Sequence, residues 1–205
     1  MKSVYDFVVK PLNSRYNNKK IINGKELLIN TNIYNHEFTS REAVVKSLPI
    51  IGKTNVKVGD IVVVHHNLFR RWHNVRGEEK NSYGYFNEEN YFVSKDQVFL
   101  IKRNGKYIAV DGYCFVKPIF SQDKFNVSKE QPLKGILKHA DTKAKSFGLK
   151  EGDLVGFSPF DEYEFVLDGQ RMYRVMTQFI TIKYEYEGNE EEYNPSWAES
   201  SRRTD

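Results

Sequence analysis

The stretch NVKVGDIVVVHHNLF, residues 55–69, returns in closely similar form as GLKEGDLVGFSPFDE, residues 148–162. In both copies a Lys stands two residues before a Gly-Asp pair, and an apolar run follows at once. Gly tolerates a positive φ and Asp bonds nearby backbone N–H groups, so this pattern is typical of a tight turn that leads into a strand. One such turn is common, but two predict that the chain is built twice. We interpret the four turn residues as structural: Gly59, Asp60, Gly152 and Asp153.

Two further landmarks recur in the same order. The sequence FVVKPL (7–12) matches CFVKPI (114–119), and NYFVSKDQVFLI (90–101) matches RMYRVMTQFITI (171–182), which aligns Ile101 with Ile182. Three ordered landmarks predict two related domains, at residues 1–111 and 112–187. The remaining residues, 188–205, are polar and are expected to form a flexible tail.

Composition places the chain among globular proteins. It has 205 residues, of which 40% are hydrophobic and 14% aromatic, and a formal net charge of +4. The single cysteine, Cys114, excludes an intrachain disulfide framework and suits a reducing cytoplasm, where we interpret it as a buried strand residue. No apolar run is long enough for a signal peptide or a membrane span. These features predict a soluble cytoplasmic protein.

Strand signals dominate the sequence. Short runs rich in β-branched and aromatic residues alternate with Gly, Asn, Asp, Lys or Pro, and no stretch keeps a helical apolar period for three turns. Asn-Gly in KRNGKY (102–107) and Asp-Gly in VLDGQRMY (166–173) are strong hairpin signals. The expected fold is all-β, of barrel or sandwich type.

The order of these landmarks resembles the GroES co-chaperonin family. VKVGDIVVV is similar to that family's signature strand, TSREAVVKS (39–47) to the strand after its mobile loop, and YFVSKDQVFLI to its C-terminal strand. The second copy matches in KGILKHA, KEGDLVGF and MYRVMTQFITI. The resemblance implies two tandem GroES-like β-barrel domains, the second shorter than the first. It also implies assembly into a homo-oligomeric ring, of seven subunits if the family pattern holds.

The resemblance places function in a loop that only the first copy has, at residues 13–40. The family binds its chaperonin through an apolar tripeptide that follows a Gly in this loop, and here Leu27, Leu28 and Ile29 follow Gly24. Such a loop would order into a groove between two helices of the chaperonin. The order-of-magnitude gain from each buried aliphatic side chain is about 1.5–3 kcal/mol, so several loops acting together would supply the affinity.

The loop also departs from the family pattern. Lys25 and Glu26 separate the Gly from the tripeptide, and a second apolar pair, Ile21 and Ile22, is a possible alternative anchor. An ordinary edge strand in ELLINTNIY is the competing interpretation. The segment LPIIGKTN (48–55) is short where the family builds a roof hairpin. Whether both domains enter the ring stays open.

The stretch after the first Gly-Asp strand, residues 65–90, mixes His65, His66 and His73 with Arg, Trp and Tyr residues. Adjacent residues of a strand point to opposite faces, so His65 and His66 are not expected to share a metal ion, and no metal site is predicted. Arginines beside aromatics are typical of a surface for single-stranded nucleic acid, but Glu78 and Glu79 reduce the positive field. A solvated, partly packed surface loop is the favoured interpretation, ahead of a protein-binding or nucleic-acid surface.

The expected function is that of a co-chaperonin without catalytic activity or cofactor, whose GroEL-type partner chaperonin binds the ATP. The double length and the many Asn, Lys and Tyr residues suggest a viral protein that acts on a host chaperonin, in the host cytoplasm. The alternative is a structural or assembly protein, for example of a virion, that uses the same fold without binding a chaperonin. A nucleic-acid-binding β-barrel that uses residues 70–76 is a third possibility.

Overall fold

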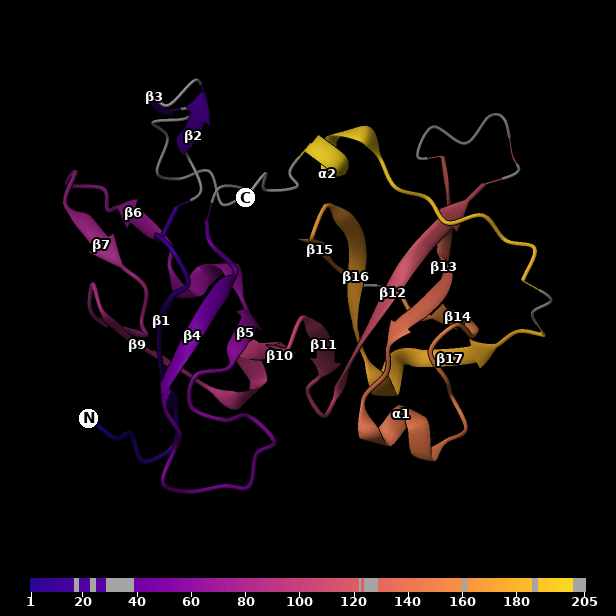
Figure 1. Ribbon diagram of the computed structural model, residues 1–205, viewed down its shortest axis with the longest axis horizontal. Coiled ribbons are helices and arrows are strands. Elements are labelled where there is room, and N and C mark those ends of the chain that lie inside the picture. The colour runs from indigo at the N-terminus through magenta and orange to yellow at the C-terminus, as the bar shows by residue number, and fades with distance from the viewer. Residues whose placement is uncertain are drawn as a thin grey trace. The chain divides into compact units, whose positions relative to one another are not determined.

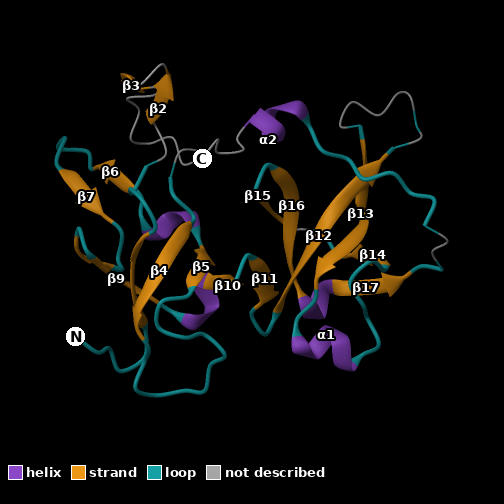
Figure 2. Ribbon diagram, in the orientation of Figure 1, coloured by secondary structure: helices purple, strands orange, loops and turns teal. Residues whose placement is uncertain are grey.

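The computed structural model describes residues 1–16, 19–22, 25–28, 39–121, 123, 129–159, 162–185 and 188–200. The chain divides into two compact units, Met1–Tyr107 and Ile108–Asp205 (Figure 1). Both are built mainly from antiparallel strands, and the few helices are short (Figure 2). The predicted all-β class is confirmed.

The first unit contains a seven-stranded sheet with the strand order β11-β10-β5-β4-β1-β9-β8. Two further strand pairs, β2–β3 and β6–β7, form separate two-stranded sheets. Short 3-10 turns, η2 and η3, lie at His66–Leu68 and Lys95–Gln97. The strands of the unit are β1 (Phe7–Pro11), β2 (Lys19–Ile22), β3 (Lys25–Leu28), β4 (Glu42–Ser47), β5 (Ile61–Val64), β6 (Arg71–His73), β7 (Glu79–Asn81), β8 (Tyr85–Asn87), β9 (Asn90–Val93), β10 (Val98–Arg103) and β11 (Lys106–Ala109).

The second unit contains a six-stranded sheet with the order β15-β16-β12-β13-β14-β17. Its helices are α1 (Thr142–Ser146) and α2 (Ser196–Ser200), and the 3-10 turn η4 lies at Thr177–Phe179. Its strands are β12 (Tyr113–Phe120), β13 (Glu130–His139), β14 (Leu154–Phe157), β15 (Tyr163–Leu167), β16 (Gln170–Met176) and β17 (Ile180–Lys183).

The two sheets repeat one topology. When β1 is matched with β12, the order β8-β9-β1-β4-β5-β10 of the first unit corresponds strand by strand to β15-β16-β12-β13-β14-β17 of the second. The matched first strands even share a register shift, between Val8 and Val9 in β1 and between Phe115 and Val116 in β12. Such bulges re-aim the strand locally, so their recurrence at one position indicates the same backbone path.

The register corrects one detail of the sequence alignment. Val9 pairs with Tyr91, and its counterpart Val116 pairs with Tyr173, so these tyrosines are equivalent. The same shift of one residue applies to the last strands. Ile101 pairs with Val62, and Lys183 pairs with Val155, the equivalent valine of the second unit. The counterpart of Ile101 is therefore Lys183 and not Ile182. Matching the two isoleucines by identity was wrong, since a slip of one residue moves every side chain to the opposite face of a strand.

The expectation that each unit forms a closed barrel is also wrong. Closure requires the two edge strands of a sheet to bond to each other. Within the described residues the first sheet ends at β11 and β8 and the second at β15 and β17, and no pairing joins these ends. In the first sheet, β11 covers the outer edge of β10 because the Asn104-Gly105 turn folds it back.

Both dipeptide hairpin signals predicted their turns correctly. Asn104 and Gly105 have φ values of 52° and 74°, and Asp168 and Gly169 have values of 49° and 76°. Positive φ at both central residues is the signature of the type I′ turn, which matches the twist of antiparallel strands. The turns join β10 to β11 and β15 to β16.

The core of each unit lies among the matched strands. In the first unit Val9, Val62, Tyr91 and Leu100 are fully buried. In the second unit a cluster around Val116 gathers residues of β12, β13, β14 and β16 with Ala140 and Ala144: Cys114, Val116, Leu137, Ala140, Ala144, Val155, Phe157 and Val175. Cys114 is therefore a buried strand residue, and burial raises the pKa of its thiol.

The described part of the C-terminal segment differs from the expected flexible tail. Residues 190–200, called the strap below, lie against the second unit and end in α2 (Figure 1). Glu192 forms a β-bridge with Ile119, and Ala198 of α2 is fully buried. The polar composition was misleading because backbone bonds and ion pairs, rather than apolar burial, hold most of this segment.

Candidate functional site

The predicted binding loop, residues 13–40, joins β1 to β4 and contains the β2–β3 hairpin (Figure 1). The pairing is antiparallel, with Lys20 opposite Leu27 and Lys19 opposite Leu28. The described part of the loop is thus partly regular, and β3 fits the strand interpretation of ELLINTNIY over residues 26–28. The second unit has no such hairpin among its described residues, because β12 and β13 follow each other closely.

The predicted anchor residues are only partly described. Leu27 lies in β3 and exposes 49% of its surface, which is a large fraction for an aliphatic residue in a strand. Leu28 follows it in β3, whereas Ile29 lies outside the described residues. The alternative anchors Ile21 and Ile22 occupy β2, where they lie opposite Glu26 and Lys25 rather than opposite Leu27 and Leu28.

The two ends of the loop, residues 12–16 and 39–42, are bonded to each other; they are called the loop root below. Tyr16 and Thr39 form an isolated β-bridge, and the Ser40 N–H donates to the Arg15 carbonyl at 2.9 Å. Arg15, Tyr16, Thr39 and Ser40 are all buried. The two ends of the loop that contains the hairpin are therefore held together by backbone bonds.

Arg15 is the main side chain of the loop root. Its Nη2 donates to Asn81 Oδ1 at 2.7 Å, its Nη1 to Glu88 at 3.1 Å and its Nε to the Phe69 carbonyl at 3.3 Å. The guanidinium also lies over the rings of Tyr85 and Tyr91, at 5.1 Å and 5.5 Å from their centroids. A buried cation needs such partners, and here most of them come from residues 65–90.

Residues 65–90, called the insert below, therefore support the loop root. The backbone N–H of Arg71 donates to the Tyr16 hydroxyl at 2.8 Å, and the Arg71 guanidinium lies over the Tyr16 ring. Phe69 is fully buried edge-to-face against Tyr91. This role leaves no signal in the sequence, because Arg15 and Tyr16 are far from the insert along the chain and no local pattern links them.

Tyr91 contacts both Arg15 of the loop root and Phe69 of the insert. It is fully buried, and within the described residues its hydroxyl has no hydrogen-bond partner. Burial raises the pKa of this phenol, so it stays protonated at neutral pH. Its neutral ring gives the Arg15 guanidinium an aromatic face to lie on.

The histidines of the insert do not point apart as expected. Strand β5 ends at Val64 and the chain turns into η2, so the rings of His65 and His66 stack at 4.4 Å. Nδ1 of His65 accepts the Asn67 N–H at 3.2 Å. In the part of the chain that the structure describes, no three His, Cys, Asp or Glu side chains gather as metal ligands do.

The cations proposed for nucleic acid are partly neutralised. Arg71 of β6 pairs with Glu79 of β7 at 3.2 Å, and Lys80 of β7 pairs with Glu78, just before that strand, at 3.0 Å. Trp72 exposes 37% of its surface. These contacts lower the local positive field on which binding to phosphates depends.

The Gly-Asp turns have the same geometry in both units. Asp60 accepts the Lys57 N–H at 2.7 Å, and Asp153 accepts the Lys150 N–H at 2.8 Å. Gly59 and Gly152 have φ values of 88° and 97°. The carboxylates also pair with cations of the matched strands, Asp60 with Arg103 and Asp153 with Lys183. These contacts support the structural interpretation of the turns.

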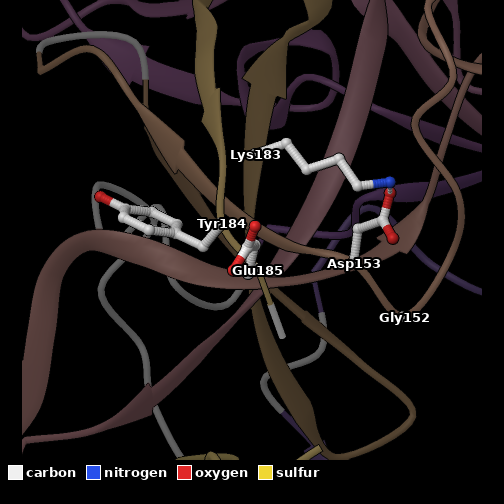
Figure 3. A pocket seen from close by; sticks show the side chains of 5 residues that line it. All are labelled: Gly152, Asp153, Lys183, Tyr184 and Glu185. Carbon is white, nitrogen blue, oxygen red and sulfur yellow. Dashed lines mark ion pairs between the residues drawn. The ribbon is translucent and has the colours of Figure 1, made fainter. Parts of the chain in front are cut away.

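A hollow of about 480 Å³ lies beside the second turn and is lined by Gly152, Asp153, Lys183, Tyr184 and Glu185 (Figure 3). The Lys183 and Asp153 side chains meet at one side of it, at 2.6 Å, and the Tyr184 ring points away from this pair (Figure 3). The ion pair and the Lys150 N–H lower the pKa of Asp153 against the opposing effect of burial. Its carboxylate is thus held in a turn and is not poised to transfer a proton at neutral pH.

No helix within the described residues is long and apolar enough to cross a membrane. A scan against known protein families finds no match to the sequence, and a search of curated proteins also finds none.

Proposed function

We propose that the chain is a co-chaperonin that caps a GroEL-type chaperonin ring and assists protein folding without chemistry of its own. The observation that carries the proposal is the β2–β3 hairpin with its half-exposed Leu27, next to a buried and bonded loop root. Its strand β3 begins the apolar segment Leu27, Leu28 and Ile29. The repeated strand order of the two units is compatible with tandem GroES-like domains.

The hairpin suits a reversible contact. Leu27 is half exposed in the free protein, so its burial in a partner's groove gains less than burial of a fully exposed leucine. A single hairpin therefore binds weakly. A homo-oligomeric ring would present several hairpins at once, and their effective concentration would raise the affinity without new contacts.

Co-sedimentation with a bacterial chaperonin, with and without nucleotide, tests the proposal. We expect nucleotide-dependent binding by the wild type, and loss of binding in Leu28→Asp. The matched variants are Ile22→Asp on the paired strand and Val75→Asp on the insert, where the side chain is fully exposed. Retention of binding by Leu28→Asp with loss in Ile22→Asp would move the anchor to β2. Absence of wild-type binding to a competent chaperonin would refute the proposal.

One observation favours the alternative of a structural or assembly protein. The loop root is bonded to the insert through Arg15 and Tyr16, and the described part of the loop forms strands. Limited proteolysis of residues 13–40 separates the two functions. Protection of this region only by chaperonin with nucleotide supports the cap, whereas equal resistance in the free protein supports the structural function.

A further inference from the structure

The edge of β12 in the second unit has two different neighbours. Strand β16 pairs with β12 from Tyr113 to Val116 and then diverges. Beyond that point the strap takes over the same strand, because the Tyr193 N–H donates to the Pro118 carbonyl and the Phe120 N–H donates to the Glu191 carbonyl, both at 2.8 Å. The last residues of β12 are therefore a strand-docking edge that the chain's own C-terminal segment occupies.

Side chains make this edge specific for the strap. The acids of the strap meet bases of β13: Glu190 pairs with Lys134 at 3.2 Å, and Glu192 pairs with Lys138. The Tyr193 ring packs edge-to-face on Phe120, with centroids 4.9 Å apart. The edge thus fits an extended acidic segment with an aromatic residue.

Asn194 fixes the position of the strap. Its Oδ1 accepts from Lys117 Nζ at 2.7 Å and from the Arg171 N–H at 2.9 Å, and its Nδ2 donates to the Gly169 carbonyl at 3.0 Å. One side chain therefore satisfies donors or acceptors on β12, on β16 and on the turn before β16. Few other side chains have both an acceptor and donors in this arrangement.

Docking of the strap also has an unfavourable part. Lys117 exposes only 1% of its surface, and its ammonium group has two neutral acceptors, Asn194 and Gln170. The charges that face it are Glu192 and Glu199 from the strap, Lys138 from β13 and Arg171 from β16, so acids and bases nearly offset each other. Burial lowers the pKa of Lys117 to about 8, which means that burial of the charged form opposes docking at neutral pH.

We propose that the end of β12 is a docking site for the strap of a second copy of this chain, and that the strap of the same chain is its displaceable occupant. The contacts described above join the strap to strands and a turn of the second unit, so the strap of a second copy can make the same contacts. Exchange of an identical segment is a low-cost route to assembly because it creates no new interface. The proposal goes beyond the chaperonin contact and does not depend on it.

Disulfide trapping between full-length chains tests the exchange. Ile119 and Glu192 are opposite residues of a β-bridge, a spacing that suits a disulfide. In a Cys114→Ala background, one population carries Ile119→Cys and the other Glu192→Cys, and the mixture is oxidised with oxidised glutathione. We expect a covalent heterodimer in the mixture and none in either population alone.

Three controls define the outcome. Both cysteines on one chain should form an internal disulfide, which verifies the docked geometry. Ile119→Cys mixed with Glu191→Cys should not cross-link, because adjacent strand residues face opposite ways. Since Ile119 is buried, the pair Gln131→Cys and Glu190→Cys, whose side chains meet at 3.4 Å, repeats the test near the surface. Internal disulfides without any heterodimer in both pairs would overturn the proposal.

Lys117→Met tests whether the buried amine eases release. The pKa of Lys117 falls from its ordinary value of 10.5 to about 8. This difference corresponds to docking that is weaker by up to roughly 300-fold when the amine is charged than when it is neutral. Loss of two hydrogen bonds, at about fivefold each, offsets part of the gain. We therefore expect roughly tenfold slower heterodimer formation in Lys117→Met, and no change in Lys10→Met, the matched variant of the first unit. An unchanged rate in Lys117→Met would refute its part in release.

Discussion

The two units place a guanidinium over equivalent tyrosines but supply it from different parts of the chain. In the first unit Arg15, from the loop root, lies over Tyr91. In the second unit Arg171, from β16 itself, lies over Tyr173 at 4.9 Å from its ring centroid. The position of the cation is retained while its origin in the chain changes. This end of the sheet therefore tolerates different peripheral segments as long as the tyrosine, which is fully buried in the first unit and partly buried in the second, has a cation on its face.

The same ends of β1 and β12 also differ in what covers them. In the first unit the loop root, which follows β1, is bonded to the insert, whereas in the second unit the strap docks on β12. The shared strands thus form a constant frame. The segments that carry the two proposals, the β2–β3 hairpin and the strap, are the parts in which the units differ.

The largest expected effect comes from a residue pair at the centre of the frame. Gly135 of β13 and Ala43 of β4 are equivalent, because they pair with Pro118 and Pro11. A Cβ at Gly135 would lie 2.3 Å from the Lys117 carbonyl oxygen, so Gly135→Ala should lower the free energy of unfolding by about 3 kcal/mol. Ala43→Gly should cost only about 1 kcal/mol. Chemical denaturation measures both, and equal small effects would contradict the closer approach of the strands in the second unit.

How far the sequence predicts such detail depends on whether the signal is local. The Gly-Asp turns and both dipeptide hairpins were predicted correctly because each depends on backbone conformations that a few adjacent residues determine. The one-residue alignment error between β9 and β16 arose because identity of isoleucines was used in place of pairing. Only the register across strands contains that information.

The candidate site was predictable only in part. The apolar residues of β3 are visible as a pattern, but the register that places Leu27 opposite Lys20 and Leu28 opposite Lys19 is a property of the hairpin. Arg15 and Asn194 carried no sequence signal because their partners are distant along the chain. The tail was predicted to be flexible from its polarity, yet residues 190–194 gain order from ion pairs and backbone bonds that polarity alone does not exclude.

The second-largest loss of stability is expected from substitution of Arg15 or Arg171, the two arginines that lie over the equivalent tyrosines. Arg171 donates to Glu130 and Glu164, and the side chains of Arg171 and Glu130 are only 13% and 14% exposed, so Arg171→Met leaves a mostly buried carboxylate without its cation. We expect a loss of about 3 kcal/mol. Arg15→Met should cost about 2 kcal/mol, because its acidic partner Glu88 is 65% exposed and stays hydrated. Denaturation of both variants in parallel tests the ranking, and a costlier Arg15→Met would show that the loop root contributes more to the fold than the strand network does.

The third effect is a rise of stability with pH that comes from Lys117 of the second unit. Because the pKa of Lys117 is about 8 in the folded protein and 10.5 in the free side chain, the unfolded chain binds more protons between these values, and stability rises with pH there. The cost of burying the charge, about 3 kcal/mol, is present in full at pH 7. Removal of the charge outweighs two lost hydrogen bonds of about 1 kcal/mol each.

Lys117→Met should therefore be about 1 kcal/mol more stable than the wild type at pH 7 and about 2 kcal/mol less stable at pH 11. Denaturation curves at the two pH values measure the difference directly. Lys10→Met is the control for general effects of alkaline pH, and its difference from the wild type should not reverse. The same sign at both pH values in Lys117→Met would contradict a buried charged amine.

The smallest effect is expected where the first unit has no counterpart in the second. Leu27 is half exposed on a hairpin outside the seven-stranded sheet, so Leu27→Asp should change the free energy of unfolding by less than about 0.5 kcal/mol. The same variant should lose binding to the chaperonin, because a carboxylate cannot enter an apolar groove without loss of its hydration. A stability loss comparable to that of the frame variants would mean that the hairpin packs as part of the fold. Unchanged stability with lost binding would show that the β2–β3 hairpin acts on a partner and that the strands shared by the two units only hold it in place.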